Sequence, residues 1–267
     1  MSAVANALRR RARSNPEGAQ AARRSRPAGP ARLGDVARTS AVDFYYQSIR
    51  IIPANVAWGV AVVGWLGVVA FVSPVIGLVV SPFLAIPFVG VMRLAALIAR
   101  GEDVVLGDVA SAWRIYAIPA IGAGVVMVAI AVTLGANVVT GALAGGPAGW
   151  AFAALAGWGL VAAWVVGLSF WSTLVDPARD HLSTLAKARL AVASVLAFPA
   201  RFGFMGLFLA VVTVASAIAV VALLTIGVGY VALVATRFTL SASDSVERWV
   251  NDGATTSLYR YGAGVRA

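Results

Sequence analysis

Three long stretches of the chain, 51–92, 115–175 and 202–236, contain no charged residue. A helix needs about 20 apolar residues to cross the hydrocarbon core of a bilayer, so each stretch is long enough for more than one crossing, the last only barely. The chain as a whole is 60% apolar and 12% charged, whereas soluble domains carry about a quarter charged residues. Runs of alanine and leucine replace the apolar–polar alternation that a membrane β-barrel requires. The sequence therefore predicts an all-α fold, a polytopic membrane helical bundle.

Turn-forming residues divide these stretches into helices. Pro82 and Pro87 predict a kink or a broken helix in the second crossing, because proline removes backbone hydrogen bonds. Gly101 is placed to end that helix. Six transmembrane helices are predicted near 51–71, 76–99, 115–139, 149–174, 203–223 and 227–242.

The distribution of charge favours six crossings over five. One helix through 202–236 would be about 52 Å long, well beyond a core of about 30 Å. Six spans place every charged residue on one side of the bilayer, whereas five would export the arginines that follow residue 236, against the positive-inside tendency. Both termini are therefore predicted to be cytoplasmic. Arginine outnumbers lysine 20 to 1, with Lys187 as the only lysine. Such a preference for arginine is typical of GC-rich bacterial genomes, so the predicted location is the bacterial plasma membrane.

The amino-terminal segment 1–39 is rich in arginine and proline and is predicted to be a disordered cytoplasmic tail. It precedes the membrane domain, 40–242, and a short cytoplasmic tail, 243–267. Contact with anionic membrane lipid is the favoured role of the basic segment, and an organellar transit peptide is an alternative. Nucleic-acid binding is disfavoured because no aromatic residues alternate with the arginines. The residues predicted to contact anionic lipid are Arg9, Arg10, Arg11, Arg13, Arg23 and Arg24.

Two helices outside the spans are also predicted. Residues 40–50 form an amphipathic helix at the amino end of the membrane domain, with its tyrosines at the membrane interface. Residues 182–198 form a cytoplasmic interfacial helix. On this second helix Leu185, Val192 and Leu196 share one face, while Ser183, Lys187 and Ser194 share another.

Four tryptophans lie on the predicted fourth span, 149–174. Trp150 and Trp171 are near its two ends and are predicted to lie at the membrane interfaces, where tryptophan is enriched. Trp158 and Trp164 are predicted to pack against neighbouring helices.

Charged residues gather at the end of the second span and in the loops 100–114 and 175–190. Arg93 is the most unusual, because a charge within a membrane helix is costly and indicates function by default. It is expected either to extend to the interface or to pair with Glu102, Asp103 or Asp108. The candidate partner-binding residues are Arg93, Arg100, Glu102, Asp103, Asp108, Arg114, Asp176, Arg179, Asp180 and Lys187.

Catalytic chemistry is not indicated by the sequence. There is no cysteine and only one histidine, His181, so neither a thiolate nor a multi-histidine metal site is available. Asp176, Asp180 and His181 could serve acid–base chemistry, but loop capping and ion pairing with Arg179 are the favoured explanation. We expect no enzyme, no catalytic residue, no metal and no cofactor.

The order of features from about 41 to 248 resembles the YesL-like family of small bacterial integral membrane proteins, a domain of unknown function. Two segments carry the resemblance: FLAIPFVGVMRLAALIARGEDVVLGDVASAWRIY at 83–116 and LVDPARDHLSTLAKARLAVASVLAFP at 174–199. The arginine-rich amino end departs from the family, in which this segment is usually short. The resemblance implies a multi-span plasma-membrane protein, often encoded beside carbohydrate ABC-transport genes, with no established catalytic residues.

The favoured function is a non-enzymatic accessory or regulatory membrane protein associated with carbohydrate ABC-type uptake. Its partner would be a membrane transporter or another subunit of a membrane complex, bound on the cytoplasmic side. One alternative is a small transporter or channel with a path lined by Asn55, Ser81 and Asn137. A second alternative is a structural subunit of a larger membrane complex.

Overall fold

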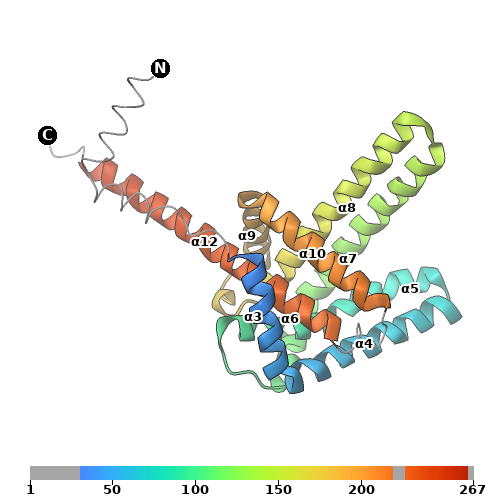
Figure 1. The fold of residues 1–267 in the computed structure, drawn as a ribbon, viewed down its shortest axis with the longest axis horizontal. Coiled ribbons are helices and arrows are strands. Elements are labelled where there is room, and N and C mark those ends of the chain that lie inside the picture. Colours follow the sequence, from blue (N-terminus) through green and yellow to red (C-terminus); the bar gives the residue numbers. More distant parts are fainter. Residues whose placement is uncertain (1–30, 219–225, 264–267) are drawn as a thin grey trace. The chain divides into compact units, whose positions relative to one another are not determined.

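The computed structural model describes the backbone of residues 31–218 and 226–263 and the side chains of residues 31–218 and 226–251. The regular elements in these ranges are all helical (Figure 1), so the predicted all-α fold is confirmed for this part of the chain. The elements are α3 (Leu33–Tyr46), α4 (Ser48–Phe71), α5 (Pro74–Val80), η1 (Ser81–Leu84), α6 (Ala85–Arg100), α7 (Gly107–Ala144), α8 (Gly146–Leu174), η2 (Pro177–Arg179), α9 (Thr184–Ala197), α10 (Pro199–Ile218) and α12 (Val228–Ala263).

The chain divides into two compact units. The first, Ala31–Ser243, contains all the helices up to the first part of α12. The second unit contains the remainder of α12, from Asp244 onward. Within this second unit Arg248 donates hydrogen bonds to the backbone oxygen of Asp244 and to the hydroxyl of Ser245.

Among the residues that the structure describes, five helices are long and apolar enough to cross a membrane: α4, the composite helix Pro74–Arg100, α7, α8 and α10. The predicted fifth span, 203–223, falls on α10 and extends into residues outside the described part of the chain. The predicted sixth span, 227–242, falls on the first part of α12, which is not among the five. Helix α12 continues to Ala263, so the helix does not end where the predicted span does.

The amino end of the membrane domain differs from the prediction. Helix α3 begins at Leu33, so residues 33–39 are helical and their assignment to a disordered tail was wrong. The predicted amphipathic helix at 40–50 is also two helices, because α3 ends at Tyr46 and α4 begins at Ser48. The arginines predicted to contact lipid, Arg9 to Arg24, lie outside the described residues.

The second crossing is broken where its prolines predicted. Pro82 lies in η1, a short 3₁₀ helix that separates α5 from α6. Helix α7 crosses close to this break, since a Cβ atom built on Gly124 would lie 2.9 Å from the backbone oxygen of Pro82. Gly101 ends α6 in the left-handed conformation, with φ of 75°, as predicted.

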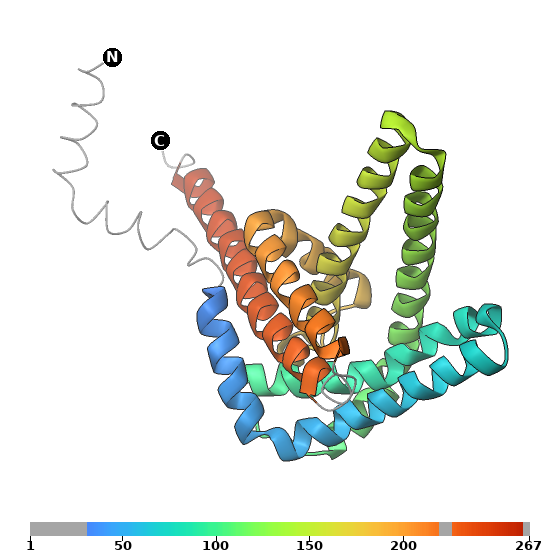
Figure 2. The same cartoon turned by 45° about the vertical axis from the view of Figure 1, so that its right-hand side comes forward.

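Helices α7 and α8 form a long hairpin and lie side by side in both ribbon views (Figures 1 and 2). The connection uses Gly145 and Gly146, whose φ angles of 64° and 65° suit glycine. The two helices touch near this end through Gly141 and Gly149. A Cβ atom on Gly149 would lie 2.6 Å from the backbone oxygen of Gly141, so only glycine fits there.

Two apolar clusters form the core of the unit Ala31–Ser243. One joins α4, α6, α7, α8 and the start of α12, and includes the fully buried side chains of Val89 and Met92. The other joins α3, α8, α10 and α12 around Phe202 and Phe238, whose rings pack edge to face at 5.2 Å.

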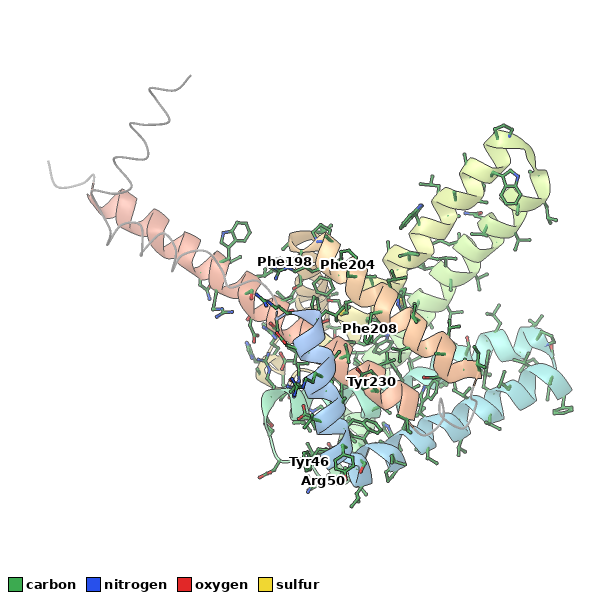
Figure 3. All side chains as sticks on the ribbon, in the orientation of Figure 1. Tyr46, Arg50, Phe198, Phe204, Phe208 and Tyr230 are labelled. Atoms are coloured by element: carbon green, nitrogen blue, oxygen red, sulfur yellow. The ribbon has the colours of Figure 1, made fainter. Side chains whose placement is uncertain are left out.

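The amphipathic helices present their apolar faces outward. On α9 the side chains of Leu185 and Leu196 are 61% and 72% exposed, while Lys187 and Ser194 are buried. Exposed aromatic residues include Tyr46, at the end of α3, and Phe204, on α10 (Figure 3). A soluble protein would show the reverse arrangement.

Candidate functional site

Arg93, two turns before the end of α6, lies at the centre of the candidate site. Its terminal nitrogens contact the two carboxylate oxygens of Asp180 at 3.3 and 3.1 Å. Nη1 also donates to the backbone oxygen of Val175 at 2.8 Å. The alternative that Arg93 pairs with the 100–114 loop is therefore wrong, because its carboxylate partner comes from the loop after α8.

Asp176 is the second centre of charge and is completely buried. Arg100 approaches it with two nitrogens, Nε at 3.0 Å from Oδ1 and Nη2 at 2.7 Å from Oδ2. Arg179 forms a second ion pair with the same carboxylate. Oδ1 also accepts a hydrogen bond from the backbone N–H of Ala178, so Asp176 caps the amino end of η2. The predicted capping and pairing with Arg179 are confirmed, and Arg100 is an additional partner.

Lys187 enters the site from α9, although it had been placed on the polar face of an interfacial helix. Its ammonium group donates to the backbone oxygen of Leu174 at 2.7 Å and lies 3.7 Å from Asp180. Only 4% of the side chain is exposed. Burial lowers the pKa of Lys187, and the nearby carboxylates of Asp180 and Asp176 oppose this effect.

Tyr116, on α7, completes the site and was missed by sequence analysis. Its hydroxyl donates to Asp180 and accepts from Arg93 at 3.2 Å. The cationic groups of Arg93 and Lys187 lie 5.7 and 5.4 Å from the centre of its ring. Such distances allow cation–π attraction. The spacing of Val109, Ala112 and Tyr116 marks a buried helical face, but this pattern does not predict a role for the hydroxyl.

These groups form two ion-pair clusters that share the short segment 175–180, and we call the two together the ion-pair network. In one cluster Asp180 contacts Arg93, Lys187 and Tyr116. In the other cluster Asp176 contacts Arg100 and Arg179. The network connects α6, α7, α9 and the loop after α8. Four basic side chains and two carboxylates give the network a formal charge of +2. Six of the ten predicted partner-binding residues thus lie together, in contact mainly with one another. Because burying charge is costly without partners, we expect the loss of one member of the network to weaken the arrangement of these helix ends.

The remaining four predicted residues lie outside this network. Glu102, Asp103 and Arg114 are exposed. Asp108 is in the first turn of α7, and its carboxylate accepts a hydrogen bond from the backbone N–H of Val105 at 2.8 Å. It therefore stabilises the loop that leads into α7.

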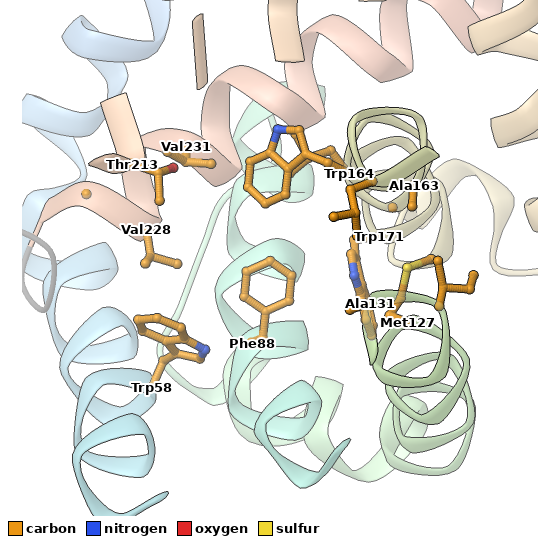
Figure 4. Close-up of a pocket in the computed structure, with 15 residues that line it drawn as sticks. Trp58, Phe88, Met127, Ala131, Ala163, Trp164, Trp171, Thr213, Val228 and Val231 are labelled. Carbon is orange, nitrogen blue, oxygen red and sulfur yellow. The ribbon is translucent and has the colours of Figure 1, made fainter. Parts of the chain in front are cut away.

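A cavity of about 480 Å³ lies between α4, α6, α7, α8, α10 and the start of α12, and we call it the aromatic cavity (Figure 4). Its lining is almost entirely apolar. The hydroxyl of Thr213 donates to the backbone oxygen of its own helix at Leu209, so it does not alter this character. The lining residues are Trp58, Phe88, Met127, Ile130, Ala131, Leu160, Ala163, Trp164, Gly167, Leu168, Trp171, Thr213, Gly227, Val228 and Val231.

The tryptophans of α8 are distributed differently from the prediction. Trp171 is 9% exposed and packs edge to face on Phe88 at 5.5 Å, so it is a core residue rather than an interfacial one. Trp158, predicted to pack, is 72% exposed. Trp164 borders the aromatic cavity and donates to the backbone oxygen of Gly206 at 3.3 Å.

The polar path expected for a transporter does not coincide with this cavity. Asn55, Ser81 and Asn137 are all absent from its lining. The hydroxyl of Ser81 donates to the backbone oxygen of Leu78 at 2.7 Å. Within the described ranges there is no group of three or more histidine, cysteine, aspartate or glutamate residues placed to hold a metal ion.

No protein-family model, curated protein or solved structure matches the chain. The resemblance to the YesL-like family therefore stays a prediction from the sequence.

Proposed function

We propose that the chain is a non-enzymatic accessory or regulatory protein of a bacterial plasma membrane, inserted by six spans with both termini in the cytoplasm. The observation that carries membrane insertion is the outward apolar surface of the described helices. Phe71, Ile118 and Leu143 are each at least 83% exposed. In water such a surface would drive aggregation, whereas hydrocarbon solvates it.

The first part of α12 is our candidate for the sixth span. It contains a run of buried apolar residues, from Val231 to Ala235. A helix surrounded by other helices does not face lipid, so it tolerates a lower hydropathy than its neighbours. Arg237, the charge within this span, forms an ion pair with Asp43 of α3, which reduces the cost of placing it there.

The proposed working surface is the loop after α6. Glu102 and Asp103 are exposed there, and the ion-pair network fixes the helix ends on either side of them. A fixed, charged loop requires little ordering when a partner binds. The partner that fits is a membrane-complex subunit with a basic cytoplasmic surface. Association with carbohydrate uptake rests on the family resemblance alone, and the neighbouring genes would test it.

Reversing both charges with Glu102→Lys and Asp103→Lys should reduce co-purification of such a partner several-fold, and less so at high salt. Exposed charges at the rim of an interface mainly steer encounter and specificity, so a partial loss is expected. The measurement is quantitative mass spectrometry of proteins that co-purify from native membranes with each variant.

Asp35→Lys is the matched control, since Asp35 is also an exposed acidic residue, on α3. It should leave co-purification unchanged, and all variants should insert into the membrane equally. Equal co-purification by the double variant and the wild type would contradict this function. Solute flux through the purified protein alone, lost in Asn55→Leu, would favour the transporter alternative instead.

A further inference from the structure

The aromatic cavity has the chemistry of a site for a hydrocarbon chain. Fifteen residues line it, and the only side-chain hydroxyl among them already donates to its own helix. Its volume of about 480 Å³ is roughly three times that of an engineered apolar cavity that admits benzene. Apart from the indole N–H groups of its tryptophans, the lining offers a polar ligand no side-chain donor that is free of its own helix, so most of the ligand's desolvation would be uncompensated.

Five of the six helices that line the cavity, α4, α6, α7, α8 and α10, belong to the candidate membrane spans. In a protein inserted through these helices, the molecules that reach its opening are bilayer lipids. An empty cavity of this size would forfeit dispersion contacts along its whole lining.

The ion-pair network lies close to one end of this cavity along two helices. Phe88 lines the cavity on α6, and Arg93 follows it by five residues, about 7.5 Å along a helix axis. On α8, Trp171 lines the cavity and Asp176, in the following loop, is also five residues later. The formal charge of +2 in the network favours an anionic group nearby. Arg93 and Arg100 keep 16% and 22% of their side chains exposed, beside the 43% exposed side chain of Asp180, so the accessible part of the network holds two positive groups and one negative group.

We propose that the aromatic cavity binds one acyl chain of an anionic bilayer phospholipid, whose headgroup lies at the exposed side of the ion-pair network. The inference rests on the membrane insertion proposed above but not on any protein partner. The bound lipid fills the space between α4, α6, α8 and α10 and makes the packing of these helices depend on the surrounding bilayer.

Filling the cavity tests the proposal. Ala163 lines it, whereas its neighbour Ala162 is exposed on the other side of α8. Ala163→Phe should lower the amount of phospholipid retained per protein at least ten-fold, measured by native mass spectrometry after detergent extraction. Ala162→Phe should retain as much as the wild type. Gly167→Ala is a milder variant, because its added carbon would meet only the Sδ and Cε atoms of Met127, at 3.4 and 3.7 Å, which are ordinary contacts. It should keep the fold and retain less lipid than the wild type.

The headgroup is tested by adding phosphatidylglycerol or phosphatidylcholine to delipidated wild-type protein. Phosphatidylglycerol should bind and raise the thermal unfolding temperature more strongly. Equal binding of the two lipids would overturn the anionic headgroup, and equal retention by Ala163→Phe, Gly167→Ala and the wild type would overturn the site. All variants are compared after extraction from the membrane fraction. A negative outcome of the retention or the headgroup experiment therefore does not contradict membrane insertion or partner binding. Failure of insertion would instead appear as absence of the wild-type protein from that fraction.

Discussion

Replacing Asp176 with alanine will destabilise the protein by about 3–5 kcal/mol, the cost typical of removing one partner from a buried ion pair. The carboxylate is completely buried and contacts the guanidinium groups of Arg100 and Arg179. Its loss leaves excess positive charge in a site of formal charge +2 and also removes the cap of η2. The measurement is the free energy of unfolding by denaturant in a defined detergent.

Asp103→Ala is the control for this experiment, because Asp103 is exposed and lies outside the ion-pair network. An exposed charge contributes little, so this variant should stay within about 0.5 kcal/mol of the wild type. If the two alanine variants unfold with the same free energy, the network does not hold the helix ends together.

Replacing Gly149 with alanine will weaken the α7–α8 hairpin by about 1–3 kcal/mol, the usual cost of overpacking. The added carbon would lie 2.6 Å from the backbone oxygen of Gly141, so the two helices must separate. Thermal unfolding in the same detergent provides the measurement.

Gly157→Ala, on the same helix, is the opposite case. No atom lies within 4 Å of the carbon that it would add, so it should be neutral or stabilise by up to about 1 kcal/mol through helix propensity. Equal destabilisation by both substitutions would indicate that close contact of the hairpin at Gly149 is not required.

Local chemistry explains which parts of the fold could be predicted. The absence of charge located the helices, and Pro82 located the break in the second crossing, because a missing backbone N–H acts on its own turn. Gly101 ended α6 for an equally local reason, the left-handed conformation that glycine adopts easily.

Tertiary contacts explain what could not be predicted. Arg93 and Asp180 are 87 positions apart, and sequence spacing does not indicate which of several carboxylates an arginine will meet. Tyr116 gives no polar signal until the fold brings its hydroxyl to Asp180. The segment 33–39 was assigned to a disordered tail because its composition continues that of the arginine-rich segment, yet α3 packs on α12 through Val36.

The orientation of α9 has a different cause. Its two faces were recognised in the sequence, but the direction in which each face points depends on the solvent. In lipid the apolar face turns outward, and Lys187 turns toward the carboxylate of Asp180. The outward orientation of apolar side chains in lipid also explains why Trp158 is exposed while Trp171, which packs against Phe88, is buried.

We propose that all the charged loops lie on the cytoplasmic side of a six-span protein. Labelling of single cysteines tests this arrangement most directly. The chain has no cysteine of its own, so each variant reports one position. Val72→Cys, in the turn after α4, and Ala148→Cys, in the first turn of α8, should react with a membrane-impermeant maleimide in intact cells. Ala178→Cys and Asn251→Cys should react only after the membrane is permeabilised. Reaction of Asn251→Cys in intact cells would contradict the even number of spans, and reaction of Ala178→Cys there would contradict the cytoplasmic position of the ion-pair network.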